Sequence, residues 1–263
     1  MRRTTFRRAT EKSADSAWNA DEAAARRGQL DTLAGQIWAA RSGFTYSSEP
    51  LTASLARARA AAENAERPVL LLDHSDNCMS GGTCGTMDVL QAALAQGLSD
   101  IAVGPLCDPE AVRILAQAGV GAEIELPLGN KIALASIGVT IHPLVLRGTV
   151  RRVSDGQYTV TGPTYTGMRC SMGRSVHFDV GVAQIVVTER TQEPWDIGVF
   201  SCVGLDPTQH RFMLLKSRMY CRPVFGPLSA ALIECDSAGV TSSDYALFPF
   251  RNVRRPVFPL DPL

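Results

Sequence analysis

The sequence lacks the residue spacings that mark the commonest metal and nucleotide sites. It has seven cysteines but no CxxC pair, which argues against a zinc ribbon, and the odd count argues against a disulfide framework. Its four histidines form no HxH, HxxxH or HExxH pair, and neither a Walker motif nor a GxGxxG loop occurs. Residue patterns alone therefore predict no complete metal site, and a reducing, cytoplasmic location is expected.

Net charge and long apolar runs are also absent. Lys plus Arg and Asp plus Glu both total 26, so nothing favours a nucleic-acid or anionic-membrane partner. No apolar run approaches the roughly 20 residues needed to span a bilayer. With 263 residues, of which 45% are hydrophobic, the chain can bury a core of its own. These totals favour a small molecule, a peptide or another chain as the partner.

The chain is organised in sections of different pattern. Residues 1–29 begin with MRRTTFRRATEK and are expected to form a basic, disordered tail, and residues 30–66 read as a helical lead-in. Residues 67–131 alternate strand and helix, which predicts a βαβαβ section with parallel strands. Residues 132–263 show period-two alternation, which predicts a β-rich antiparallel section with a hairpin turn at SDGQ and a proline-rich end. The predicted fold class is α/β with N-terminal helices.

One helix of the α/β section is bounded especially well by its sequence. Asp108 fits the N-cap, Pro109 the first helical position and Gly119 the C-terminal end. We therefore expect a helix between Asp108 and Gly119.

A strand-to-helix turn, DHSDNCMSGGT at 73–83, carries most of the polar chemistry. It follows the apolar run PVLLL, and loops at the carboxyl ends of parallel strands face the ligand crevice of an α/β sheet. Adjacent glycines before a helix can direct backbone N–H groups at an anion, so one interpretation is a phosphate or carboxylate site. The alternative is a tight structural turn, in which Asp76 and Asn77 satisfy backbone groups. The candidate substrate- or anion-binding residues here are Asp73, His74, Asp76, Asn77, Ser80, Gly81, Gly82 and Thr83.

The same turn carries potential metal ligands and thiols. Asp73, His74 and Asp76 are weak candidates for metal ligands, since carboxylate and imidazole suit zinc or manganese. Neighbouring strand residues point to opposite faces, so at most Asp73 and one other of the three could converge. Cys78 and Cys84 flank the glycines, where a helix N-terminus could lower a thiol pKa.

A second polar cluster lies in LLKSRMYCRPVF at 214–225, where cations end an apolar strand. Its candidate binding residues are Lys216, Ser217 and Arg218. The two cations share a side-chain phase, so they could bind a carboxylate or pair with Asp76 or Asp88. The alternative is a solvated strand end.

Seven stretches occur in this order: IWAARSGF, LLLDHSDNCMSGGT, GLSDIAVGPLCDPEAV, GVGAEIELPLGNK, VSDGQYTVTGPTYTGM, VGLDPTQHRFMLLKSR and GVTSSDYALFPFRNVRRPVFPLD. Together they resemble the C-terminal region of the microcystinase C (MlrC) family of zinc metallopeptidases, from about Leu30 to Asp261. The resemblance implies hydrolysis of peptide bonds, best known on linearised microcystin, with zinc as the cofactor. In that family an N-terminal α/β domain supplies the zinc ligands. The resemblance therefore implies ligands outside this chain, with an N-terminal metallopeptidase domain or subunit and a peptide substrate as partners.

The chain departs from the family pattern in two places. After KSR, members usually continue with a histidine and then an acidic residue before proline, whereas residues 220–222 read YCR and 225–227 read FGP. GTCGT also lacks the acid that often follows the glycines, which leaves Asp88 as a shifted substitute. These losses favour an alternative: a non-catalytic ligand-binding or interaction module, or a truncated remnant, derived from that family.

Overall fold

The computed structural model describes residues 20–262. The chain divides into two compact units, 1–47 and 48–263, and each is described by itself. None of the helices in the described part of the chain combines the length and the hydropathy that a membrane span requires.

The first unit contains one long helix. Of the expected tail at 1–29, residues 1–19 lie outside the described part of the chain. The next residues are helical, since α2 spans Ala20–Ala39 and a short 3-10 turn follows at Arg41–Phe44. This helix begins before the expected lead-in because alanine and arginine, which are frequent here, are strong helix formers.

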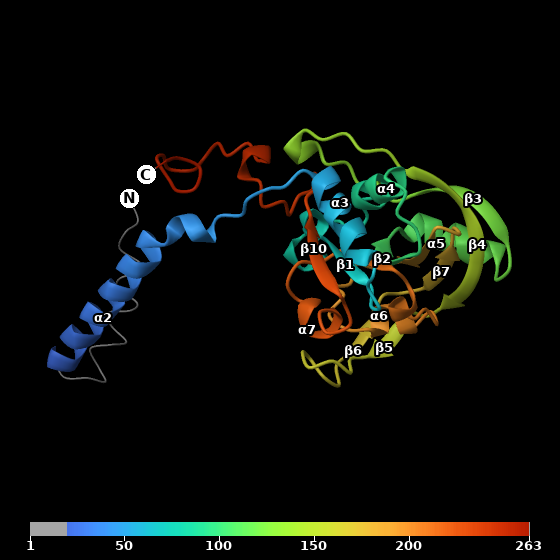
Figure 1. The fold of residues 1–263 in the computed structure, drawn as a ribbon, viewed down its shortest axis with the longest axis horizontal. Coiled ribbons are helices and arrows are strands. Elements are labelled where there is room, and N and C mark those ends of the chain that lie inside the picture. Colours follow the sequence, from blue (N-terminus) through green and yellow to red (C-terminus); the bar gives the residue numbers. More distant parts are fainter. Residues whose placement is uncertain (1–19, 263) are drawn as a thin grey trace. The chain divides into compact units, whose positions relative to one another are not determined.

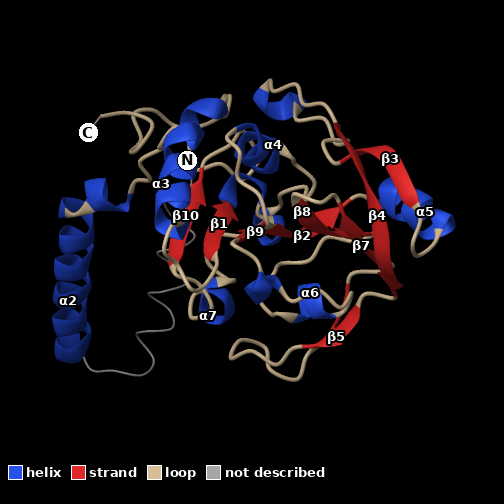
Figure 2. Cartoon of the chain, turned by 45° about the vertical axis from the view of Figure 1, so that its right-hand side comes forward, coloured by secondary structure: helices blue, strands red, loops and turns tan. Residues whose placement is uncertain are grey.

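An eight-stranded mixed sheet forms the centre of the second unit (Figure 1, Figure 2). Its strand order is β10-β1-β9-β2-β8-β7-β4-β3. The first five strands in this order are parallel, and the last three alternate in direction. The bounds are β1 Val69–Asp73, β2 Ile101–Cys107, β3 Glu123–Leu128, β4 Leu144–Ser154, β7 Ser175–Asp179, β8 Ala183–Thr188, β9 Phe212–Leu215 and β10 Ala231–Cys235.

Helices cover both faces of this sheet, so the second unit has two cores. Side chains of α3, α4 and α5 belong to the larger core, whereas α6 and α7 contribute Phe200 and Phe225 to the smaller one. A two-stranded sheet, β5 with β6, lies beside α6 (Figure 1). The bounds are α3 Leu51–Ala62, α4 Asp88–Ala95, α5 Pro109–Ala118, α6 Gly198–Ser201, α7 Arg222–Phe225, β5 Gln157–Thr159 and β6 Arg169–Ser171.

Strand β1 contributes to both cores. Val69 and Leu71 belong to the larger core, Leu70 and Leu72 to the smaller one, and all four are fully buried. A parallel strand covered on both faces needs a continuous apolar run, which is why the sequence reads VLLL here. The predicted α/β class is confirmed, and β1, α4 and β2 form the expected parallel unit.

Strand β3 differs from the prediction, because it runs antiparallel to β4 at the edge of the sheet. Its residues alternate between exposed Glu123 and Glu125 and buried Leu126 and Leu128. Such alternation is typical of a strand with one solvated face, not of a central parallel strand. In the β-rich section, β9 and β10 are also parallel to β1 instead of antiparallel.

Two local predictions had opposite outcomes. The helix bounded by Asp108 is confirmed: its carboxylate accepts the N–H of Ala111 at 3.0 Å, and Gly119 caps the end with φ 85°. The prediction of a hairpin at SDGQ is wrong, because β5 pairs with β6 and not with β4. A turn fixes only local geometry, whereas the pairing depends on packing against α6, which the residues around the turn do not reveal.

Candidate functional site

Strands β1 and β9 bring the two polar clusters of the sequence together. They pair in parallel with Leu72 opposite Leu215, so Asp73 and Lys216 leave the sheet side by side at its carboxyl edge. Lys216 Nζ lies 2.6 Å from Asp73 Oδ2 and 3.4 Å from Asp76 Oδ2. Its ammonium also donates to the hydroxyl of Thr86 at 2.8 Å and to the main-chain carbonyl of that residue. The ion pair is buried on every side.

The Asp76 carboxylate receives most of the hydrogen bonds of the turn. Backbone N–H groups of Cys84 and Thr86 donate to it at 2.9 and 2.8 Å, and the Thr83 and Thr86 hydroxyls donate at 2.9 and 3.0 Å. The pKa of Asp76 is lowered, because Lys216 and these donors outweigh the desolvation that would raise it. These donors of the turn therefore bind the carboxylate of Asp76, a residue of the turn itself.

Opposing effects also act on Lys216. Burial would lower the pKa of its ammonium, but the adjacent carboxylates of Asp73 and Asp76 more than compensate and raise it. Lys216 is therefore a permanent cation. A pairing of Lys216 with Asp76 was one of the possibilities considered from the sequence. The buried ion pair between Lys216 and Asp73 was not predicted.

The glycines of the turn serve its tight geometry. Gly81 has φ 98°, and its N–H donates to the Cys78 carbonyl at 3.2 Å. The N–H of Gly82 donates to the Asn77 carbonyl at 2.8 Å, and a Cβ there would lie 2.6 Å from the carbonyl carbon of Asp76. The N–H of Ser80 donates to Asn77 Oδ1 at 3.1 Å. These donors are therefore engaged within the turn.

The residues after β9 diverge to three different partners. Lys216 points inward, Ser217 donates its hydroxyl proton to Glu193, and Arg218 pairs with Glu234 at 3.3 Å. Arg218 is half-buried, whereas Lys216 and Ser217 are fully buried. The two cations do not share one ligand.

The zinc that the resemblance implies does not fit the residues of this region. Within residues 20–262, no three His, Cys, Asp or Glu side chains are grouped so that they could hold a metal ion. The Lys216 ammonium stands between Asp73 and Asp76, where a metal bound to both would have to be. His74 approaches Asp236 instead, with 3.7 Å between Nε2 and Oδ1, and burial lowers the pKa of its imidazole.

Glu193 is the site residue that sequence reasoning missed. It is 3% exposed and accepts hydrogen bonds from Ser217, from the Met79 N–H at 3.2 Å and from the Cys78 thiol at 3.8 Å. Burial raises the pKa of its carboxyl. The signal was its place after β8, because residues that follow parallel strands converge. The expected antiparallel pairing of β8 with β7 is present, but its parallel pairing with β2 was not expected.

The possibility that the turn lowers the pKa of a thiol is not supported for Cys78. Its interaction with the side chain of Cys84, followed by burial, raises the pKa of the Cys78 thiol instead of lowering it. A raised pKa favours the protonated thiol, which is a poor nucleophile because the thiolate is the reactive form.

Comparison with known proteins identifies the family of this chain. The family model described as the MlrC C-terminus matches residues 71–252. Microcystinase C from Sphingomonas sp. is 30% identical over 196 residues, which cover 74% of this chain and 36% of that protein. A solved structure from Mesorhizobium sp. BNC1, described as a candidate metallopeptidase, has a TM-score of 0.75 and 23% identity, covering 88% of this chain and 45% of that one.

The chain thus spans 36% of the length of the curated relative that it matches. The likeness to the Mesorhizobium structure, at 23% identity, establishes the fold. The family itself follows from the match over 71–252, which is well over half of the chain. The chain belongs to the family of the MlrC C-terminus.

Proposed function

We propose that this chain is the C-terminal part of a microcystinase C-like zinc peptidase that hydrolyses peptide bonds. We further propose that catalysis needs an N-terminal domain, on the same or a separate polypeptide, that holds the zinc. Membership of the family supports the peptidase class, and the greater length of Microcystinase C supports a further domain. The observation that carries the proposal is the Lys216 ammonium between Asp73 and Asp76.

The argument from Lys216 is electrostatic. A metal bound to Asp73 and Asp76 would have to expel a buried ammonium whose charge already balances part of theirs. The Lys216 ammonium would then lose its counter-charges, and a buried charge without its partner costs about 3–5 kcal/mol. The acidic turn is therefore scaffolding, and the ligands of the proposed zinc lie elsewhere.

Few of the predicted site residues can touch a substrate directly. Six of them are buried: Asp73, His74, Asp76, Asn77, Lys216 and Ser217. The residues that can contact a substrate are exposed or half-buried: Ser80, Gly81, Gly82, Thr83 and Arg218. Arg218 and Arg222 both pair with the carboxylate of Glu234, at 3.3 and 2.6 Å, so two guanidinium groups lie close together here. We propose that this pair of arginines attracts a carboxylate of the peptide substrate.

Reconstitution tests this function. The purified chain should contain no stoichiometric zinc and should not cleave a linear peptide. Adding the N-terminal part of a microcystinase C-like protein should restore cleavage that a chelator abolishes. Arg218→Gln should then raise KM for peptides with a free carboxylate, with little change for their amides, whereas Arg147→Gln, on the exposed Arg147–Glu123 pair, is the matched control. Chelator-sensitive cleavage by the chain alone would overturn the requirement for a partner.

A second candidate function is a non-catalytic binding or interaction module. The satisfied turn favours it, since the Asp76 carboxylate already takes the backbone donors of Cys84 and Thr86. In this case the N-terminal part of a relative would bind the chain without restoring cleavage. The reconstitution assay therefore separates the two candidates.

A further inference from the structure

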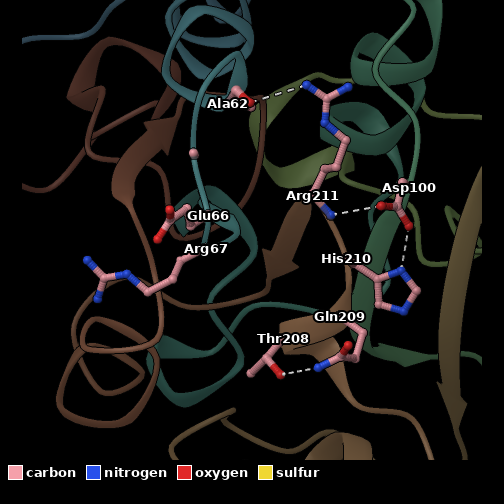
Figure 3. A pocket seen from close by; sticks show the side chains of 9 residues that line it. Ala62, Glu66, Arg67, Asp100, Thr208, Gln209, His210 and Arg211 are labelled. Atoms are coloured by element: carbon pink, nitrogen blue, oxygen red, sulfur yellow. Dashed lines mark hydrogen bonds and ion pairs between the residues drawn. The ribbon is translucent and has the colours of Figure 1, made fainter.

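A polar cavity lies at the amino ends of the same strands that carry the buried ion pair. Its volume is about 290 Å³, and it is lined by the residues just before β1, β2 and β9 (Figure 3). Arg67 of the cavity precedes Asp73 by six residues, so it lies about 20 Å from Asp73 at about 3.3 Å per residue. It is a separate place in the fold, and its function does not depend on the peptidase proposal.

One wall of the cavity is held in place by Asp100. This residue has φ 61°, and its carboxylate accepts the N–H of Arg211 at 3.0 Å and contacts His210 Nδ1 at 2.7 Å. Both bonds fix the segment before β9 against the start of β2. The wall is therefore ordered before any ligand arrives, which lowers the entropic cost of binding.

Two arginines contribute positive charge to the cavity. Arg211 comes from the wall of Asp100, whereas Arg67 comes from the opposite side, between α3 and β1 (Figure 3). Each is tethered by one guanidinium N–H to a main-chain carbonyl: Arg211 to Ala62 at 3.2 Å, and Arg67 to Pro227 at 2.8 Å. A guanidinium has five N–H donors, so each arginine keeps donors for a ligand.

Glu66 adds a carboxylate next to Arg67. Within residues 20–262, no hydrogen bond or ion pair joins its side chain to another residue. A purely anionic ligand such as phosphate would be repelled by Glu66 and by Asp100. A ligand with one positive and one negative end would instead match the arginines and Glu66 together.

We propose that this cavity binds a small zwitterion, namely a free amino acid or a dipeptide. Its carboxylate binds the guanidinium of Arg211 on one wall, and its ammonium binds Glu66 on the opposite wall (Figure 3). The volume of about 290 Å³ is at the lower end of ligand pockets, which suits a ligand of this size. Two alanines, Ala62 and Ala65, form the small apolar part of the lining, where a short side chain would lie.

Calorimetric titration of the full chain tests the proposal. The probes are alanyl-alanine, its N-acetyl derivative without the ammonium, its amide without the carboxylate, and inorganic phosphate. Alanyl-alanine should bind saturably, and each blocked derivative and phosphate should bind at least about tenfold more weakly, as expected for a lost charge-assisted contact. Glu66→Gln should weaken the dipeptide but not the acetylated probe, whereas Arg211→Gln should weaken both.

Matched controls use the exposed Arg147–Glu123 pair, whose arginine and glutamate lie on β4 and β3 away from the cavity. Arg147→Gln and Glu123→Gln should leave binding unchanged, and circular dichroism should show native folding of every variant. No saturable binding of alanyl-alanine would overturn the proposal. Binding of phosphate or of the acetylated probe as tightly as alanyl-alanine would also overturn it, because the cavity would then select an anion and not a zwitterion.

Discussion

The two ends of strands β1 and β9 use similar residue types for opposite purposes. At the carboxyl end, Asp73, Asp76 and Lys216 are buried and bonded to one another. At the amino end, Glu66 and Arg211 are exposed and keep unused hydrogen-bonding capacity around an open cavity. A polar sequence motif therefore says little about binding until the burial of its side chains is known.

The same difference explains why the polar residues at 73–83 look like a binding site in the sequence. A buried charge must be paired and hydrogen-bonded, so a structural cluster needs several specific residues close together. An open cavity is assembled from single residues before three separate strands, and water satisfies what the protein does not. The polar residues at 73–83 resemble a binding site for this reason, although they form hydrogen bonds with one another.

The largest effect on stability is expected from removing the buried cation at the carboxyl end. Lys216→Met leaves Asp73 and Asp76 without a counter-charge in a dry interior, so the free energy of unfolding should fall by about 3–5 kcal/mol. Urea denaturation at pH 7 measures this loss. Arg147→Met, which breaks an exposed pair with Glu123, should change the midpoint little. A small loss for Lys216→Met would mean that water reaches the pair.

The next largest effect concerns the glycines of the turn. Gly82→Ala places a Cβ 2.6 Å from the carbonyl carbon of Asp76 and 2.7 Å from the carbonyl oxygen of Asn77, and neither backbone atom can rotate away. The free energy of unfolding should fall by about 1–3 kcal/mol. Gly81→Ala, which meets open space and suffers only from its φ of 98°, should cost less. Equal losses in thermal denaturation would contradict a steric role for Gly82.

Several of these features were readable from the sequence. The alternation of strand and helix patterns that starts at the VLLL run predicted a parallel strand there, and Asp108 with Pro109 predicted the start of α5. The directions of β3, β9 and β10 were not readable, because they depend on pairing between segments far apart in the chain. Local residue patterns carry little information about such pairings.

The site was predictable only in part, for the same reason. A pairing of Lys216 with Asp76 was anticipated, since both follow strands, but not that the Asp76 carboxylate would occupy the donors of the turn. Glu193 was missed because the parallel pairing of β8 with β2 was not expected. The amino-end cavity was not foreseen either: Glu66, Asp100 and Arg211 are ordinary charged residues until β1, β2 and β9 align.

A smaller, pH-dependent effect is expected from Glu193. Burial raises the pKa of its carboxyl above the usual 4.5, so the folded state favours the protonated form. The stability it contributes is present below about pH 4.5 and is lost as pH rises through the folded pKa. Glu193→Gln keeps the neutral form at every pH, so its stability relative to the wild type should increase between pH 4 and pH 7. Urea midpoints at both pH values measure this, and a constant difference would contradict the raised pKa.

The smallest effect on stability is expected at the amino-end cavity. Glu66→Gln removes a carboxylate that is exposed, so the thermal midpoint should stay within error of the wild type. Asp73→Asn is the matched change at the other end of β1, and it should lower the midpoint clearly because Lys216 loses its nearest counter-charge. Loss of dipeptide binding in Glu66→Gln without loss of stability would identify a residue whose charge serves a ligand and not the fold. If the thermal midpoint of Glu66→Gln were as low as that of Asp73→Asn, Glu66 would stabilise the fold as Asp73 does. The two ends of β1 would then not differ in function.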